Sequence, residues 1–471
     1  MRPSAFLLAP FVGLATLLSV SARSSTGDRV LVVLEPSVKK DDYSKFWASL
    51  QERGFELTFK EPKDRDANLV KYGETQYDHL IVYAPSAKSF SPSLSPKSII
   101  QAQYSGINTL FFLSPELTES TREFMREYDL EFVDPSTTLI DAFSHPSGSP
   151  ASTVLLSSTS SLVPNNGEIL SPSTLSGGPI VYPSGTVHVA GQNPYLVDVL
   201  HASKTSYVGQ DKALSGDEAE VEKSIGGKGK EPVVSGKKAS LVSALQSRDN
   251  VRIGFVGSGG LASDEWWGKS VQNTDGKTLE TGNAAFITDF TKWIFQETGV
   301  VKIVDSTHFR EGEVEPREMY TKKDEITYSL TLAKHYTTSN GTSAWGPFEV
   351  DDIQLDFTML DPHIRTALVQ DKSATPEVGS VYAAKFNAPD RHGVFKFVVE
   401  YWRPGWTYIR TSTKASVVPL RHDEYPRFIT GAWPYYIATI STSITFLLFC
   451  GLWVSLAEQD KKKVNKGKKA E

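Results

Sequence analysis

Short apolar runs alternate with amphipathic stretches through roughly the first 300 residues of the chain. The apolar runs have the length of β-strands, and the stretches between them have the spacing of amphipathic helices. The predicted strands are Val30–Leu34, Phe55–Phe59, Leu80–Tyr83, Thr109–Leu113 and Val251–Val256, and the predicted helices are Tyr43–Arg53, Pro96–Ser105 and Ala284–Thr298. Strands that are buried on both faces and alternate with helices are typical of a parallel α/β sheet. We therefore expect an α/β domain over residues 23–305.

Two polar segments interrupt this alternation. Residues 144–178 are dense in Ser, Pro, Thr and Gly, and residues 215–238 contain Gly-Gly-Lys-Gly-Lys and no aromatic residue. Such compositions offer little apolar surface to bury, so they favour irregular structure over a packed core. We expect both segments to be flexible loops on the surface.

The pattern changes after about Ser306, where only strand-like runs follow. These runs are Glu325–Leu332, Ile353–Leu360, Val381–Phe386, Val394–Trp402 and Thr407–Thr411. Turn residues separate them, and residues 393–401 alternate between apolar and polar with a period close to two. The pattern predicts a small antiparallel β-sandwich over residues 306–430.

The two ends of the chain are typical of a protein that crosses a membrane once. Arg2, an apolar run from Ala5 to Val20 and small residues up to Ala22 predict a secretory signal peptide over residues 1–22. An uncleaved anchor is the alternative, but this run is short for about 30 Å of hydrocarbon. Residues 431–457 include an uncharged run, Tyr435 to Leu456, that is long enough to span a bilayer as a helix.

Basic residues follow the predicted span and set its orientation. The tail, residues 458–471, holds six lysines, so the positive-inside rule places it in the cytosol and the bulk of the chain in the lumen. Lys468 and Lys469 stand four and three residues from the C-terminus, as in the dilysine signal that retrieves proteins to the endoplasmic reticulum membrane. A merely basic flank of the span is the alternative interpretation.

Net charge and cysteine content exclude several classes of function. The formal net charge of the whole chain is −6, of which the tail contributes +3 and Arg2 contributes +1. The segment between them therefore has a net charge of −10, which does not suit a protein that binds nucleic acid. Cys450 is the single cysteine and lies in the predicted span, where we interpret it as an inert apolar side chain, with palmitoylation as the alternative. Intrachain disulfides, Cys-rich metal sites and a lumenal thiol nucleophile are therefore excluded.

One glycine-rich stretch resembles a cofactor loop. Gly257 to Ala262 follow a predicted strand and match the G-x-G-x-x-A pattern of dinucleotide-binding loops. The stretch comes late in the α/β domain, and Trp266 and Trp267 stand where a phosphate-binding helix would begin. A tight loop at the end of a strand is the favoured interpretation, and a dinucleotide site is the alternative.

Acidic and histidine residues do not form a convincing catalytic or metal site. Asp351, Asp352 and Asp356 are the densest acidic cluster of the C-terminal part, and paired aspartates hold metals in many glycosyltransferases. Asp356 alternates with Leu355, however, which favours a turn followed by a solvated strand face over a metal site. The nine histidines show no H-x-x-x-H spacing. We predict no catalytic residue, no metal and no cofactor, and name Asn340, in Asn-Gly-Thr, as a candidate glycan acceptor.

Several longer stretches resemble one protein family. They are residues 345–348 (Trp-Gly-Pro-Phe), 351–365 (Asp-Asp-Ile-Gln-Leu-Asp-Phe-Thr-Met-Leu-Asp-Pro-His-Ile-Arg), 391–397, 418–429 and 432–436. The family is a non-catalytic subunit of oligosaccharyltransferase, called wheat-germ-agglutinin-binding protein in fungi and dolichyl-diphosphooligosaccharide glycosyltransferase subunit in animals. The motif residues, expected to be structural or to contact partners, are Trp345, Pro347, Asp352, Gln354, Asp361, Pro362, Arg365, Arg427, Pro434, Tyr435 and Tyr436.

The resemblance implies a fold and a function. The implied N-terminal domain is flavodoxin-like, as in glutamine amidotransferases, and is followed by a β domain and a membrane anchor. The implied role is structural, in a complex that transfers an oligosaccharide from dolichyl diphosphate to Asn-X-Ser/Thr of nascent chains. Implied partners are the polytopic catalytic subunit, ribophorin-type and small defender-against-death-type subunits, with glycan or nascent polypeptide as a further contact. A free-standing lectin or cargo receptor is the main alternative, and a lumenal amidotransferase-like enzyme is a second one that lacks its thiol.

Overall fold

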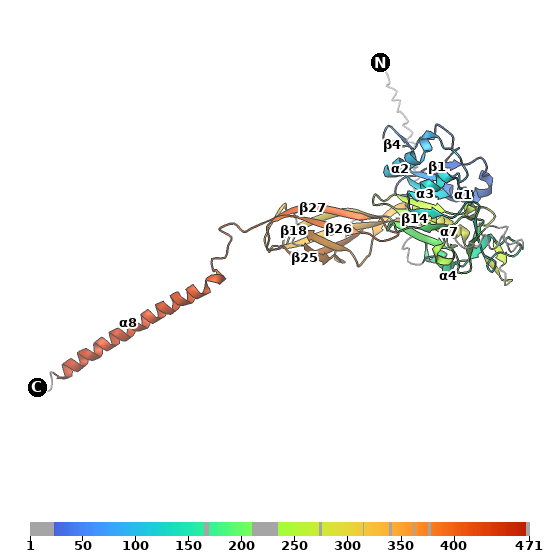
Figure 1. The fold of residues 1–471 in the computed structure, drawn as a ribbon. Helices are drawn as coiled ribbons and strands as arrows, with labels where there is room; N and C mark the ends of the chain where they lie inside the picture. Colours follow the sequence, from blue (N-terminus) through green and yellow to red (C-terminus); the bar gives the residue numbers. More distant parts are fainter. Residues whose placement is uncertain are drawn as a thin grey trace, which may run out of the picture.

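The computed structural model of the chain describes residues 23–163, 169–209, 234–272, 276–313, 315–338, 342–360, 363–374 and 378–467. They form an α/β domain, a β domain and a long C-terminal helix, in that order along the chain (Figure 1). The predicted signal peptide lies outside the described residues, as does most of the predicted loop at 215–238.

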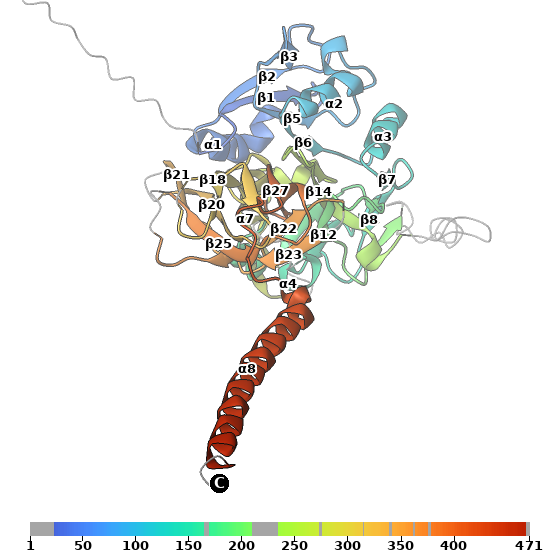
Figure 2. The same cartoon turned by 90° about the vertical axis from the view of Figure 1, so that its left-hand side faces the viewer.

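Five parallel strands form the centre of the α/β domain, as the apolar runs predicted. Their order in the sheet is β2 (Glu56–Lys60), β1 (Arg29–Leu34), β5 (His79–Tyr83), β6 (Asn108–Phe112) and β15 (Arg252–Val256). Alternate residues of β1 enter two different cores. Val30 and Val32 pack toward α1 (Ser44–Glu52) and α7 (Asn283–Ile294), whereas Leu31 and Val33 pack toward α2 (Pro96–Tyr104) and α3 (Glu119–Arg126). Figure 2 shows α1 and α2 on opposite sides of β1 and β5.

Antiparallel strands extend this sheet, which the sequence did not predict. Beyond β15 come β14 (Ser240–Gln246), β11 (His188–Ala190) and β7 (Leu130–Phe132), and β12 (Leu196–His201) also pairs with β14. The parallel α/β prediction is therefore correct for one half of a mixed sheet.

The polar segment 144–178 is not a loose surface loop where the structure describes it, so that expectation is wrong. It contains β9 (Thr153–Leu156), which pairs with β10 (Ile180–Pro183), and the short helices α4 (Ser158–Ser161) and α5 (Pro172–Leu175). Val154, Leu156 and Ile169 are fully or almost fully buried. Serine and threonine hydroxyls make these turns compatible with a packed interior: Thr174 Oγ1 donates to Asp289 Oδ2 at 2.6 Å.

Short two-stranded pairings complete the α/β domain. They are β3 (Val70–Lys71) with β4 (Glu74–Thr75), β8 (Thr138–Ile140) with β13 (Tyr207–Gly209), and β16 (Ser270–Gln272) with β17 (Thr278–Glu280).

The β domain consists of two five-stranded sheets around one core, which confirms the predicted β-sandwich. One sheet contains β18 (Val301–Arg310), β20 (Glu325–Thr337), β25 (Ser380–Asn387) and β24 (Val369–Gln370), with β21 (Ser343–Pro347) beside β20. The other has the order β19 (Met319–Thr321), β27 (Ile409–Val418), β26 (Gly393–Tyr401), β22 (Gln354–Thr358) and β23 (His363–Ala367). Tyr328 and Tyr382 of the first sheet share the core with Leu355 and Phe397 of the second.

The hairpin loop between β26 and β27 joins the two domains. Trp293 Nε1 of α7 donates to Gly405 O at 2.8 Å, and Gln246 Nε2 of β14 donates to Trp406 O at 2.7 Å. Asn250 and Tyr408 exchange two hydrogen bonds, at 2.6 and 3.0 Å. These contacts involve side chains from one domain and backbone from the other, so they fix the loop against the α/β domain.

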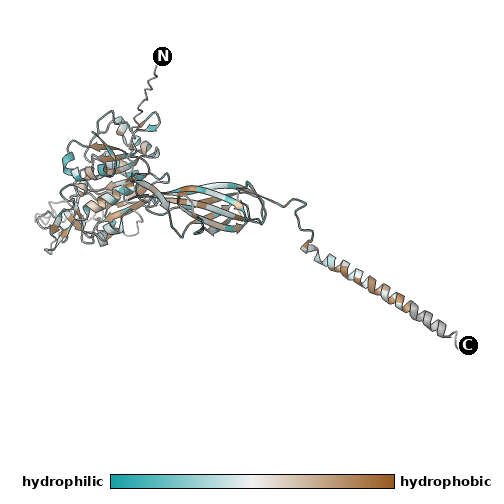
Figure 3. Ribbon diagram, turned by 180° about the vertical axis from the view of Figure 1, so that it is seen from behind, coloured by the Kyte–Doolittle hydropathy of each residue, from teal (hydrophilic) through white to brown (hydrophobic). Residues whose placement is uncertain are grey.

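The C-terminal helix α8 covers Trp433–Gly467. The segment Thr430–Leu456 is long and apolar enough to cross a membrane, with a mean hydropathy of 1.9, and it packs against no other described element (Figure 3). This segment coincides with the predicted span at residues 431–457.

Candidate functional site

The glycine-rich stretch forms a closed turn at the end of β15. Gly259 to Ala262 make one turn of 3₁₀ helix, and Ser258 Oγ donates to Pro183 O at 2.5 Å. A Cβ on Gly259 would lie 1.8 Å from the hydroxyl of Tyr83, so that hydroxyl occupies the space above this glycine. The favoured interpretation, a tight loop, agrees with this geometry.

The N-terminus of α1 already holds a carboxylate. The backbone N–H groups of Ser44 and Lys45 each donate to Asp264 at 2.9 Å, and Ser44 Oγ donates to it at 2.6 Å. The N-terminus of the first helix after β1 is where doubly wound folds bind phosphate. A phosphate could reach this helix only by displacing Asp264.

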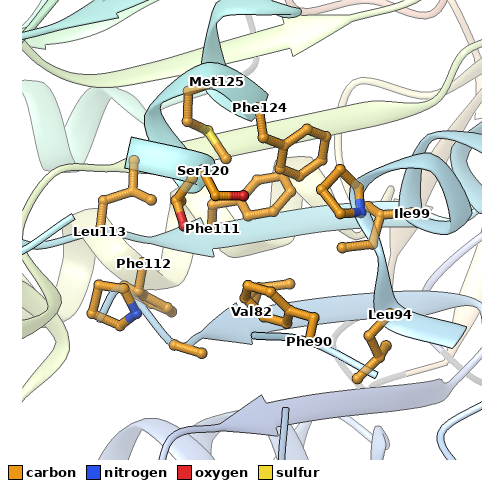
Figure 4. A pocket seen from close by; sticks show the side chains of 14 residues that line it. Val82, Phe90, Leu94, Ile99, Phe111, Phe112, Leu113, Ser120, Phe124 and Met125 are labelled. Carbon is orange, nitrogen blue, oxygen red and sulfur yellow. The ribbon is translucent and has the colours of Figure 1, made fainter. Parts of the chain in front are cut away.

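A small apolar cavity lies on the opposite face of the sheet, between α2, α3 and the strands β5 and β6. Figure 4 shows that aromatic and aliphatic side chains such as Phe111, Phe124 and Met125 surround it. Its volume is about 20 Å³. That volume suffices for about one water molecule, and apart from Ser120 and Thr121 the lining side chains are apolar. This cavity is a packing defect of the core, not a ligand site.

The acidic cluster of the β domain is divided into separate ion pairs. Arg403 pairs with Asp352, with Nε to Oδ2 at 2.7 Å, and Arg365 makes a two-pronged pair with Asp356 at 2.7 and 3.0 Å. His363 Nε2 also lies 3.5 Å from Asp356. Within the described parts of the chain, no three His, Cys, Asp or Glu side chains come together as a metal site would require.

The motif residues lie on three different surfaces. Gln354 and Arg365 are exposed on the outer face of the sheet that contains β22 and β23. Trp345 lies on β21 of the other sheet, where Lys302 Nζ sits 3.9 Å from the centre of its ring, and Pro347 is exposed at the end of that strand. Arg427 is exposed in the linker before α8. Asp361, Pro362, Asn340, Lys468 and Lys469 lie outside the described residues.

Pro434, Tyr435 and Tyr436 belong to the first turn of α8, and an aromatic cluster ties the linker to this turn. Phe428 stacks on Tyr436 with 4.9 Å between ring centres and contacts Trp433 at 5.9 Å. The N–H of Ile429 donates to the hydroxyl of Tyr436 at 3.3 Å. Aromatic residues of this kind favour the interface between lipid and water.

A pair of lysines lies on the outer face of the sheet that contains β26 and β27, and the sequence pattern did not predict it. Lys396 of β26 stands directly opposite Lys414 of β27, and both side chains are exposed. No carboxylate among the described residues forms an ion pair with either lysine. The alternation of residues 393–401 places Lys396 on the outer face, but only the pairing of the two strands brings the lysines together.

Comparison with known proteins identifies the family. A model described as "OST48, N-terminal domain" matches residues 21–297, and one described as "OST48 middle domain" matches residues 308–457. The chain belongs to the OST48 family. The boundary between the two matches coincides with β18, where the described structure changes from α/β to β.

Curated relatives cover nearly the whole chain. The "Dolichyl-diphosphooligosaccharide--protein glycosyltransferase 48 kDa subunit" of Danio rerio is 33% identical over 441 residues, covering 92% of this chain and 93% of the relative. The subunit wbp1 of Schizosaccharomyces pombe is 34% identical (88% and 89% covered), and the 48 kDa subunit of Caenorhabditis elegans is 32% identical (93% and 93%). Among solved structures, a ThuA-like protein of Parabacteroides merdae covers 49% of this chain and 78% of its own at a TM-score of 0.26 and 11% identity, too low to support an argument.

Proposed function

We propose that this chain is a non-catalytic, structural subunit of the oligosaccharyltransferase complex. The observation that carries the proposal is the family match over both domains, together with relatives that are named as subunits of this glycosyltransferase. The complex transfers a preassembled oligosaccharide from dolichyl diphosphate to Asn in Asn-X-Ser/Thr of nascent polypeptides. In this role the chain supports assembly and full activity, and a polytopic partner performs the transfer.

The geometry of the candidate sites supports a structural role. Asp352 and Asp356 are engaged by arginines, the helix end at Ser44 holds Asp264, and the cavity beside Phe111 is too small for a sugar. A free-standing lectin or cargo receptor is not favoured, because the relatives are named as subunits of a complex.

We also propose that the α/β domain is flavodoxin-like and that the β domain faces partners. The five parallel strands have the order β2-β1-β5-β6-β15 across the sheet. Counted along the chain among themselves, this order is 2-1-3-4-5, the order of flavodoxin-like sheets, which supports the assignment. Gln354 and Arg365 on the exposed sheet face, Trp345 and Pro347 on β21, and Arg427 with the tyrosines of α8 are the proposed contacts. Ribophorin-type and small defender-against-death-type subunits are the partners that the resemblance implies.

The proposal predicts co-purification with transferase activity. A tagged full-length chain, extracted in mild detergent, should carry the other subunits with it and transfer a dolichol-linked oligosaccharide to an Asn-X-Thr peptide. The same chain stripped of its partners should transfer none, and its depletion should leave secreted glycoproteins with empty sequons. Activity of the isolated chain would contradict the non-catalytic assignment, and recovery of a monomer from mild detergent would favour the receptor alternative.

The proposed topology places residues 23–430 in the lumen of the endoplasmic reticulum and residues 458–471 in the cytosol, after removal of residues 1–22. A glycan on Asn340 would report the lumenal side, so a glycosidase-sensitive mobility shift is expected that Asn340→Gln abolishes.

For the tail, a reporter that carries only the span and residues 458–471 should be held in the endoplasmic reticulum. Changing Lys468 and Lys469 to Ser should release it to the surface while Lys461 to Lys463 keep its orientation. Equal surface levels of both reporters would show that the tail is only a basic flank.

A further inference from the structure

Three large apolar side chains are exposed at one end of the β-sandwich. Met319, Val394 and Leu360 are 60%, 57% and 104% exposed. Met319 and Val394 both pair with Ser416 of β27, so they lie in one row across three strands. β22 ends at Thr358, which pairs with Lys396, and Met359 packs against Gly393, so the chain reaches Leu360 at the same end of this sheet as Val394. This row, Met319–Val394–Leu360, is called the apolar row below.

The turn that carries Leu360 is fixed by its neighbour. Gly393 has φ +152°, and a Cβ there would lie 2.4 Å from Sδ of Met359. Glycine therefore lets Met359 pack onto the sandwich, where it contacts the core, while the next residue points outward. Exposure of Leu360 is thus a feature of a packed turn.

The lysine pair lies beside the apolar row on the same face of the sheet. Lys396 is two residues from Val394, and Lys414 is two residues from Ser416. Side chains two residues apart on a strand are neighbours on the same face, so the lysine pair lies next to the apolar row. Like charges directly opposite each other across two strands are destabilising, so the pair does not serve the stability of the sheet. Apolar side chains next to lysines form the pattern of a surface that lies on lipid headgroups.

The chain tethers this end of the sandwich to the membrane. β27 ends at Val418, and only Pro419 to Ile429 separate it from the apolar segment that begins at Thr430. Fully extended, this linker reaches about 40 Å. Two contacts shorten the reach of the linker further. The N–H of Glu424 donates to Arg421 O in a turn, and Phe428 stacks on Tyr436. Tyr425, Phe428 and Ile429 are themselves more than half exposed, as suits residues at a lipid surface.

We propose that the apolar row rests on the surface of the bilayer that α8 crosses. Leu360 enters the interface most deeply, Met319 and Val394 lie beside it, and the ammonium groups of Lys396 and Lys414 reach the lipid phosphates. The contact holds the sandwich, and through the fixed hairpin loop the α/β domain, at a set height above the membrane. This contact needs only α8 in a membrane, so it stands or falls separately from the role in oligosaccharyltransferase.

The single native cysteine makes a direct test possible. In a Cys450→Ala background, the full-length chain is reconstituted into phosphatidylcholine vesicles after a nitrobenzoxadiazole probe has been attached to cysteine at Leu360 or Val394. The matched control is cysteine at Val369, an exposed valine (68%) on β24 of the other sheet, where it pairs with Ala383 near the middle of β25. A distant control is Tyr72 of the β3–β4 hairpin, which is 96% exposed.

Phosphatidylcholine with a nitroxide near its headgroup should quench the probes at positions 360 and 394. Their emission should also shift to shorter wavelength than in detergent, whereas the probes at 369 and 72 should show neither change. Equal quenching at 360, 394 and 369 would overturn the proposal. So would probes at 360 and 394 that are insensitive to the lipid quencher but become protected when partner subunits are added, because the row would then be a protein interface. Unchanged thermal unfolding of each labelled variant serves as the folding control.

Discussion

Replacing Arg252 by leucine should lower the free energy of unfolding by about 3–5 kcal/mol. The guanidinium of Arg252 is completely buried beneath the joint between the two domains. It donates to three backbone carbonyls, those of Trp293 and Thr298 at 2.7 Å and that of Gly299 at 2.6 Å, and lies 4.6 Å from the centre of the Trp293 ring. Burial lowers the pKa of Arg252 to about 9, so it is charged at neutral pH. Leucine would leave the three carbonyls without these donors in a dry interior.

The measurement is urea unfolding of the full-length chain in detergent, followed by tryptophan fluorescence. Arg248→Leu is the matched control, because Arg248 is exposed at the same joint and only lies over the rings of Tyr195 and Tyr408. Its loss should cost less than about 1 kcal/mol. Equal effects of the two substitutions would show that the three carbonyl contacts do not stabilise the joint.

The parallel half of the sheet could be predicted because its strands carry their own signal. Residues 30–33 are apolar in succession and are buried on both faces, so the pattern can be read without knowing any partner. The antiparallel half could not be predicted, because β7 and β11 have only three residues each. They also pair across a long stretch of chain, since Phe132 lies opposite His188. Three residues are too few to show a period.

Site residues could be predicted where their placement depends on the local pattern, and could not where it depends on contacts between distant segments. Alternation placed Asp356 on an outward strand face, and its pairing with Arg365 agrees with that interpretation. The opposition of Lys396 to Lys414 depends on the register of two strands, which the sequence does not state. Likewise, Arg252 is a charged residue within a predicted strand, and its burial follows only from carbonyls that α7 and the following turn bring to it.

Two buried histidines should make the α/β domain sensitive to acid. His79 lies between the rings of Phe55 and Phe295, and burial lowers its pKa to about 4. His188 lies beside Phe132, and burial lowers its pKa to about 3. Nε2 of His188 is 2.6 Å from Ser243 Oγ, while its Nδ1 is buried without a hydrogen-bond partner. A proton on either ring would therefore place a charge in the buried interior of the domain, away from solvent.

The sign of the effect follows from the proton balance. Both histidines have a pKa near 6.5 in the unfolded chain, so below that pH the unfolded state binds more protons than the folded state. The contribution of the two neutral histidines to the free energy of unfolding is complete above about pH 6.5. It is lost as the pH falls toward 4, by about 1.4 kcal/mol per pH unit for each histidine. Between pH 8 and pH 5, the two together should remove about 4 kcal/mol of stability. Burial also lowers the pKa of His308 and His335, which adds to the effect in the same direction.

The test compares urea midpoints of the full-length chain and of His188→Gln at pH 8, 6.5 and 5. Glutamine keeps a polar group within reach of Ser243 but does not titrate, so the variant starts less stable at pH 8 and loses less on acidification. At pH 5 the gap between the two proteins should have narrowed by about 2 kcal/mol, the share of one histidine. A constant gap across the three pH values would mean that His188 takes up no extra proton on unfolding. The acid sensitivity would then have to come from His79 and from the buried His308 and His335 of the β-sandwich.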